Sequence, residues 1–321
     1  MDVLNKAKHG ALIAGMSVAT LGYAEGTAEQ QQASLLKEAI VIAQSGDIKG
    51  TLKNNALNHA ETYVEEKASS LLGQYFNTVD LGIEFNDGKP EYNLGLLKAY
   101  DEENPDAFVF SQLNLNRIDD RTTLNLGLGY RVLNTDETWM GGVNAFYDHE
   151  FPYDHRRAGA GAELISSAVK IRGNLYWGLS DYKDDKNGTT AKALDGQDID
   201  LELALPYLPG AAVAYNSFKW NAIDGGTDLE GKKFAFRANL TNNIKLEVDR
   251  IDYDDAGRED INRIQLNYVW RFGKHQKVPT IFDVSDKAFE LRKLESERYD
   301  LVKRENKIIK QTNFNVVATG F

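Results

Sequence analysis

The chain has 321 residues, of which 42% are hydrophobic and 26% are charged, and its formal net charge is -11 at pH 7. This acidic balance argues against nucleic-acid binding, which needs a basic surface. Because the chain has no cysteine, disulfides and thiolate metal sites are excluded. No run of about 20 apolar residues follows the N-terminal region, so no transmembrane helix is predicted there.

The N-terminal residues have the pattern of an export signal. Lys6 and Lys8 precede the apolar stretch "GALIAGMSVATLGYA", and Gly22 and Ala24 supply small residues for cleavage. This order is typical of a secretory signal peptide, so we predict one over residues 1–24 and a location in a Gram-negative cell envelope. A short buried helix is the alternative.

Residues 25–76 are predicted to be mainly helical. In "QQASLLKEAIVIAQ" and "ALNHAETYVEEKASSLLGQYF" apolar residues recur three and four positions apart, and "SGDIKG" separates the two stretches. A lid, a dimerisation element and a simple spacer all fit this pattern.

From Asn77 to Phe272 apolar and polar residues alternate, which predicts strands, because successive side chains of a strand point to opposite faces. The predicted strands are 77–86, 91–100, 107–116, 121–131, 139–149, 156–165, 168–180, 197–206, 211–220, 233–241, 244–253 and 261–272. Their length, about 9–13 residues, suits tilted strands that cross a bilayer, whereas strands of soluble proteins commonly have about 5–6 residues.

One face of these strands is apolar and the other is rich in glycine and charge. The residues predicted to face lipid are Leu124, Leu126, Leu128, Leu175, Trp177, Leu201 and Leu203. The residues predicted to line a polar lumen are Arg121, Arg131, Arg157, Glu163, Arg172, Asp200, Glu202, Arg263 and Arg271. Glycine weakens the interior of a strand, so its recurrence on the polar face suggests that something approaches the wall closely.

The connections between strands alternate in length. Tight turns such as "SS" and "TNN" alternate with longer loops, notably "DYKDDKNGTTAKALDG" and "NAIDGGTDLEGK". This asymmetry is typical of outer-membrane barrels, and in hydrocarbon the sheet has to close so that every backbone group is paired. We therefore predict an all-β fold, a 12-stranded antiparallel transmembrane β-barrel, with a soluble sandwich as the alternative.

Four stretches resemble the transmembrane domain of the intimin and invasin family, the inverse autotransporters of type V secretion. They are "FSQLNLNRIDDRTTLNLGLGYR", "GGVNAFYDHEF", "HRRAGAGAEL" and "LVKRENKII", within a likeness that spans residues from about 57 to 310. The resemblance implies a periplasmic N-terminus, a barrel over 77–272, and a segment, 273–321, that returns through the pore with a C-terminal passenger. It also implies a barrel-assembly signal at Tyr268, Trp270 and Phe272.

The segment 273–321 is predicted to plug the pore, with a helical first half and an extended second half. Its basic residues expected to contact the wall are Arg292, Arg298 and Arg304. Their expected partners are Glu163, Asp200 and Glu202. Long family members continue into immunoglobulin-like and lectin-like modules, so the passenger is expected to be absent or truncated here.

One predicted external loop carries residues that could support chemistry, namely Asp148, His149, Asp154 and His155. Paired Asp and His residues could activate water or bind zinc. We favour a polar loop, because the family-like motif accounts for the same residues. "KDDKNG" fails the calcium-loop pattern at both ends, so no catalytic, metal or cofactor site is predicted.

These features together predict a non-enzymatic outer-membrane translocator and anchor that displays an adhesin-type passenger. The expected partners are outer-membrane lipid, the barrel assembly machinery, periplasmic chaperones, a cell-surface receptor reached by the passenger, and a second copy of the chain, with no nucleic acid. An open porin and a surface hydrolase are the alternatives.

Overall fold

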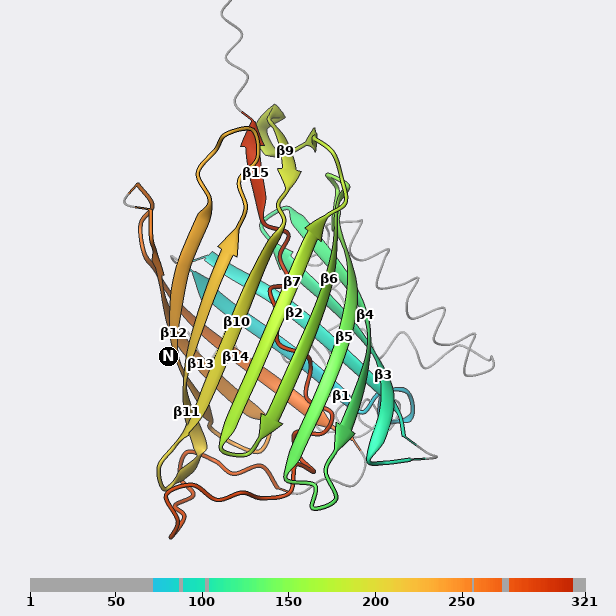
Figure 1. The fold of residues 1–321 in the computed structure, drawn as a ribbon, viewed down its shortest axis with the longest axis vertical. Helices are drawn as coiled ribbons and strands as arrows, with labels where there is room; N and C mark the ends of the chain where they lie inside the picture. Colours follow the sequence, from blue (N-terminus) through green and yellow to red (C-terminus); the bar gives the residue numbers. More distant parts are fainter. Residues whose placement is uncertain (1–71, 87–88, 102–103, 256, 273–276, 314–321) are drawn as a thin grey trace, which may run out of the picture.

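The computed structural model describes residues 72–86, 89–101, 104–255, 257–272 and 277–313 and has a closed antiparallel barrel of twelve strands (Figure 1). The barrel strands are β1 (Thr78–Asn86), β2 (Lys89–Tyr100), β3 (Ala107–Ile118), β4 (Arg121–Leu133), β5 (Trp139–Phe151), β6 (His155–Ser166), β7 (Val169–Gly178), β10 (Gly196–Leu205), β11 (Leu208–Trp220), β12 (Leu229–Asn239), β13 (Ile244–Tyr253) and β14 (Ile261–Arg271). Pairing between β1 and β14 closes the sheet.

The predicted barrel and its strands are confirmed. The ends of the predicted strands differ from the observed ends by four residues at most. The N-terminal predictions fall mainly outside the described residues: the signal peptide (1–24) lies outside them entirely, and of the helical segment only residues 72–76 are described, with 72–75 helical.

The two rims of the barrel differ. We call the rim that carries the turns 134–138, 167–168 and 206–207 the short-turn rim, and the opposite rim, with the loops 179–195 and 221–228, the long-loop rim. On the long-loop rim, β8 (Lys183–Asp184) and β9 (Thr190–Ala193) form a small sheet with β15 (Lys310–Asn313), which Figure 1 shows at the top. The turn η2 (Lys186–Gly188) lies between β8 and β9.

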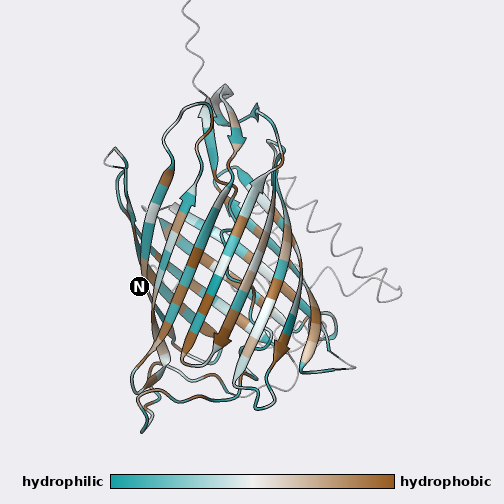
Figure 2. Ribbon diagram, in the orientation of Figure 1, coloured by the Kyte–Doolittle hydropathy of each residue, from teal (hydrophilic) through white to brown (hydrophobic). Residues whose placement is uncertain are grey.

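Apolar and polar residues alternate along the barrel strands, as Figure 2 shows by colour. Six of the seven residues predicted to face lipid are exposed by 37–63%: Leu126, Leu128, Leu175, Trp177, Leu201 and Leu203. The seventh, Leu124, lies on the same face of β4, between Leu115 on β3 and His149 on β5, but is only 7% exposed. A contiguous apolar outer surface of this extent is typical of a membrane-facing barrel.

The C-terminal segment, by which we mean residues 277–313, crosses the barrel without forming a helix. The predicted helix in its first half is therefore wrong within the described residues, and no described helix is long and apolar enough to span a membrane. The segment first follows the short-turn rim, where Ile281 N–H donates to the Asn239 carbonyl at 2.8 Å and Tyr207 N–H to the Ala288 carbonyl at 3.0 Å. It then passes through the lumen and ends in β15 at the long-loop rim (Figure 1).

Candidate functional site

The candidate site is the lumen, where the barrel wall holds residues 294–309, which we call the luminal stretch. Arg131 on β4 donates to two main-chain carbonyls of this stretch, at 3.0 and 2.8 Å. Arg157 on β6 donates to two more, at 2.9 and 2.6 Å. Both arginine side chains are fully buried, so the wall presents two buried, charged donors to the backbone of the passing chain.

Uncharged wall residues add further main-chain contacts. Asn125 donates to the Asn306 carbonyl at 3.0 Å. The Gln112 side-chain oxygen accepts the N–H of Val302 at 2.9 Å, and the Tyr176 hydroxyl accepts the N–H of the luminal stretch at residue 305, at 2.8 Å. An extended chain cannot pair its own backbone groups, and a buried unpaired group is costly, so these side chains replace a sheet partner.

One carboxylate joins the wall to the side chains of the luminal stretch. Asp148 on β5 is fully buried and accepts two hydrogen bonds from Arg304, both of 2.7 Å. It also accepts one from Arg157 at 2.8 Å and one from Asn125 at 2.7 Å. Arg304 stacks on Phe146, with 4.4 Å between the guanidinium carbon and the ring centroid. The carboxylate of Asp148 therefore lies between two buried arginines, Arg157 of the wall and Arg304 of the luminal stretch.

The lumen also has an apolar part near the short-turn rim. Leu294 and Val302 of the luminal stretch are buried there, and Leu301 packs beside them. The wall contributes buried side chains from β2, β3, β4, β5 and β6: Leu97, Ala99, Phe108, Phe110, Leu133, Met140, Phe146 and Ile165. The luminal stretch is thus held by apolar packing at one end and by ionic contacts further along.

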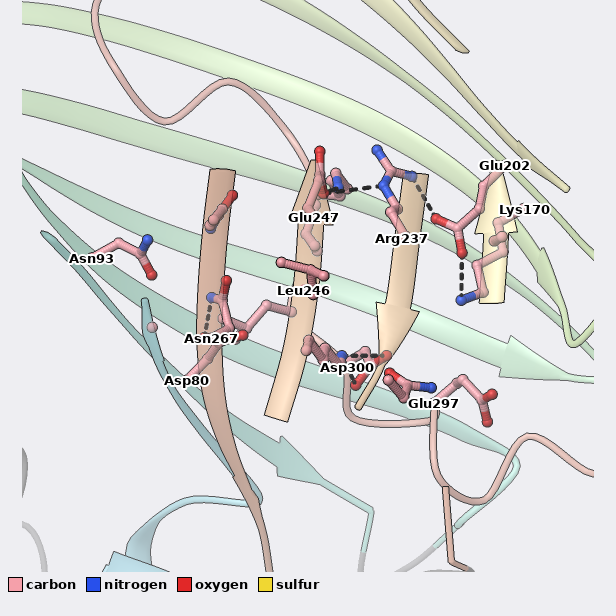
Figure 3. A pocket seen from close by; sticks show the side chains of 18 of the residues that line it. Asp80, Asn93, Lys170, Glu202, Arg237, Leu246, Glu247, Asn267, Glu297 and Asp300 are labelled. Atoms are coloured by element: carbon pink, nitrogen blue, oxygen red, sulfur yellow. Dashed lines mark hydrogen bonds and ion pairs between the residues drawn. The ribbon is translucent and has the colours of Figure 1, made fainter. Parts of the chain in front are cut away.

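A cavity of about 350 Å³ lies beside the luminal stretch. Figure 3 shows Glu202, Arg237 and Glu247 on its wall, from β10, β12 and β13, with Asp300 of the luminal stretch nearby. Arg237 pairs with Glu202 at 2.5 Å and with Glu247 at 3.1 Å, and Lys303 of the luminal stretch also pairs with Glu247, at 2.5 Å. The charges that line this cavity are therefore mostly compensated.

The charged residues predicted to line the lumen form ion pairs with the wall or with the luminal stretch. The pairs are Arg121–Glu150 at 3.7 Å, Arg131–Glu163 at 2.7 Å, Arg157–Asp148 at 2.8 Å, Arg172–Asp200 at 2.8 Å, Arg172–Glu202 at 3.4 Å, Arg263–Asp249 at 2.9 Å and Arg271–Asp300 at 3.1 Å. Most of these contacts join neighbouring strands of the wall.

The predicted partners of the three arginines in the C-terminal segment are wrong. Arg304 pairs with Asp148, Arg298 with Glu137 at 3.1 Å, and Arg292 with Glu297. The carboxylates predicted for them are already paired within the wall: Glu163 with Arg131, and Asp200 and Glu202 with Arg172 and Arg237.

Sequence reasoning did not assign the main-chain contacts of Gln112, Asn125 and Tyr176. All three stand at inward positions of their strands, and Gln112 begins the alternating series "QLNLN" on β3. Amides repeated on the polar face of a barrel strand were the available signal, because an amide can serve both an N–H and a carbonyl group.

The prediction that Asp148, His149, Asp154 and His155 share one external loop is wrong. Only residues 152–154 form the turn, and Asp148 faces the lumen from β5. His149 is on the outer face, where it stacks on Phe151 at 4.3 Å and pairs with Asp154 at 2.9 Å. His155 is fully buried. The hydrolase alternative requires these four side chains to converge on one point, and they do not.

The residues predicted as an assembly signal lie at the end of the barrel sheet. Tyr268 and Trp270 are on β14, with ring centroids 4.4 Å apart, and Phe272 follows the strand. The Phe272 N–H donates to the Asn77 carbonyl at 2.8 Å, which places this residue at the seam where the barrel closes.

At the long-loop rim the C-terminal segment is fastened by pairing and by charge. β15 pairs with β9, and Lys310 donates to Glu150 at 2.6 Å and to Asp185 at 2.9 Å. Burial tends to raise the pKa of the Asp185 carboxyl, but the hydrogen bond and charge of Lys310, together with a hydrogen bond from the Lys186 main chain, keep this pKa below its ordinary value. Asp185 is therefore ionised at neutral pH, and the contact is charge-assisted.

Comparison with known proteins agrees with this architecture. Residues 26–306 match the family model described as "Inverse autotransporter, beta-domain". The chain belongs to the inverse autotransporter family. This inverse autotransporter domain, with its closed barrel and apolar outer surface, is an outer-membrane domain.

Several adhesins are similar to this domain. The chain is 31% identical over 216 residues to the inverse autotransporter adhesin YeeJ of Escherichia coli K12, covering 64% of the chain and 9% of the adhesin. Intimin of Escherichia coli O127:H6 is 29% identical over 88% of the chain, which covers 30% of intimin. Invasin of Yersinia enterocolitica is 26% identical over 84% of the chain, which covers 33% of invasin. The chain thus spans a third or less of the length of these three relatives.

One solved structure has the same fold. It comes from a study of in-meso crystallization of membrane proteins, and it superimposes with a TM-score of 0.62 at 24% identity. The match covers 74% of this chain and 100% of the other. At this identity the likeness extends to the fold alone.

Proposed function

We propose that this inverse autotransporter domain is a non-enzymatic translocator and anchor that displays a C-terminal passenger on the cell surface. The observation that carries the proposal is the path of the C-terminal segment, which enters at the short-turn rim and leaves at the long-loop rim. The short-turn rim would face the periplasm and the long-loop rim the cell exterior. A chain that continues beyond residue 313 would then emerge outside the cell.

The contacts in the lumen support a mechanism based on main-chain recognition. The wall donors Arg131, Arg157 and Asn125 bind carbonyls of the luminal stretch, a group that every residue of a passing chain carries. Such a wall favours passage of an extended chain of many sequences. The final side-chain contacts, such as Arg304 with Asp148, then favour one resting register. Passenger folding and these contacts would supply the free energy.

The domain assignment proposed from the sequence fits this mechanism. It comprises a signal peptide (1–24), a periplasmic helical segment (25–76), the barrel (77–272) and the pore-traversing linker (273–321). The proposed partners are outer-membrane lipid on the apolar face, the barrel assembly machinery at Tyr268, Trp270 and Phe272, periplasmic chaperones, and a host or neighbouring-cell receptor reached through the passenger. The adhesin relatives support the receptor, and a homodimer remains part of the proposal.

The experiment is an accessibility assay on intact cells. An epitope fused after Phe321 should bind antibody without permeabilisation, and an epitope inserted in the short-turn rim at residues 134–138 should bind only after permeabilisation. Heat-modifiable migration on gels reports barrel folding in each variant. A folded barrel whose C-terminal epitope stays hidden until the outer membrane is opened would contradict the proposal.

A further inference from the structure

Three metal-binding side chains meet at the long-loop rim, apart from the contacts that hold the main chain in the lumen. Glu150 is at the end of β5, His155 begins β6, and Asp185 lies in the β7–β10 loop. One ligand atom of each lies within 4.8 Å of the others. The β5–β6 hairpin and the β7–β10 loop thus bring an imidazole nitrogen and two carboxylate oxygens to one point.

His155 is the unexplained member of this cluster. Its side chain is fully buried, yet neither ring nitrogen has a hydrogen-bond partner among the described residues. A buried polar group without a partner is costly, and native structures nearly always satisfy it. The adjacent carboxylates of Glu150 and Asp185 are already engaged by Lys310, at 2.6 and 2.9 Å. The imidazole therefore lies beside a cation-binding position but forms no hydrogen bond of its own there.

Lys310 occupies the place that a metal ion would take. Its side chain is only 6% exposed, and its ammonium group lies between the two carboxylates. A lysine ammonium and a divalent cation compete for the same oxygens, and the imidazole can contribute only to the metal. Because Lys310 begins β15, the competition is between a metal ion and the seated end of the C-terminal segment.

We propose that Glu150, His155 and Asp185 form a zinc site that opens when Lys310 leaves. One imidazole and two carboxylates are a three-ligand set that zinc accepts, with water as the fourth ligand. Zinc–ligand distances of about 2.0–2.2 Å place donors about 3.4 Å apart, so the cluster has to contract by roughly 1 Å. Asp185 is on a loop and can move, whereas the other two ligands are on rigid strands.

Other charges near the site limit its affinity. Arg121 lies 3.7 Å from Glu150 and opposes a second cation there. Zinc should therefore bind weakly while Lys310 is seated and more tightly once its charge is removed. The inference does not depend on what the passenger does, because binding is measured on the purified full chain.

The test is zinc titration calorimetry on the full chain folded in detergent micelles. The variant Lys310→Met should bind one equivalent of zinc at least tenfold more tightly than the unmodified chain. Adding His155→Gln or, separately, Asp185→Asn to Lys310→Met should weaken binding at least tenfold. Heat-modifiable migration on gels reports whether each variant folds. If His155→Gln prevents folding, Asp185→Asn replaces it as the test variant, because it changes only a loop residue.

The matched control is His149→Gln in the Lys310→Met background. It removes the partly exposed imidazole of the His149–Asp154 pair, and zinc affinity should not change. X-ray absorption of the loaded Lys310→Met variant should show one imidazole and oxygen ligands only. Equal zinc binding with and without His155, or loss of binding through His149→Gln, would overturn the proposal.

Discussion

Replacing Arg304 by Met is the sharpest test of how the luminal stretch is held. The Arg304 side chain is 1% exposed and donates two hydrogen bonds of 2.7 Å to Asp148. Methionine keeps much of the apolar length that stacks on Phe146 but removes the charge. Asp148 retains Arg157 and Asn125, so the substitution weakens the hold on the luminal stretch more than it weakens the wall.

The magnitude follows from the burial of this pair. Removing one partner of a buried ion pair costs about 3–5 kcal/mol, and the remaining partners of Asp148 place this case near the lower end. Because about 1.4 kcal/mol is a tenfold change in an equilibrium, about 3 kcal/mol raises the population of the displaced state about a hundredfold.

Single-channel recording in planar lipid bilayers measures this population directly. Arg304→Met should open about a hundred times more often than the unmodified chain. The control is Arg250→Met, since Arg250 is 53% exposed, pairs with Asp252 and Asp260, and lies away from the lumen. If Arg304→Met forms a folded barrel that opens no more often than Arg250→Met, the Asp148 contact does not hold the luminal stretch.

Three further predictions follow from the same contacts. Deleting residues 285–321 should give a large, steady single-channel conductance, and unchanged conductance would contradict a blocking role for the C-terminal segment. Leu201→Arg should lower the free energy of unfolding in lipid vesicles by about 2–4 kcal/mol, far more than Leu201→Ala, because an exposed charge at mid-strand would enter hydrocarbon; a water-exposed Leu201 would show no such difference. Gly210→Ala places a Cβ 2.0 Å from the Thr280 main chain. It should release the segment from the short-turn rim and speed its cleavage by added protease, and an unchanged cleavage rate would show that the segment does not lie there.

The barrel was predictable because its two faces meet different media. Lipid on one side and a charged lumen on the other impose a period of two on every strand, so a one-residue error would turn the charges outward. This is why every predicted strand matches an observed one, with ends that agree within four residues. Leu124 shows the limit of the rule, since its direction was predicted but not its burial.

The pairing of the luminal charges was not predictable in the same way. A charge on the inner face can pair with the next strand or with the luminal stretch, and the choice depends on strand register. Asp200 lies beside Arg172 across β10 and β7, so it was not available to Arg304. Register across twelve strands is a property of the closed sheet and is absent from any single stretch of sequence.

The C-terminal segment shows why a helical pattern can fail inside a barrel. The sequence "DKAFELRKLESERYDLVKRENK" has the charge and apolar spacing of an exposed helix, which pairs its own backbone. In the lumen, wall arginines, amides and a tyrosine hydroxyl take over that pairing, as the contacts of Arg131, Arg157 and Gln112 show. Once the wall satisfies the backbone, an extended chain spans the bilayer with far fewer residues than a helix, since it rises about 3.3 Å per residue instead of about 1.5 Å. The wall therefore selects the conformation that also suits passage of a chain.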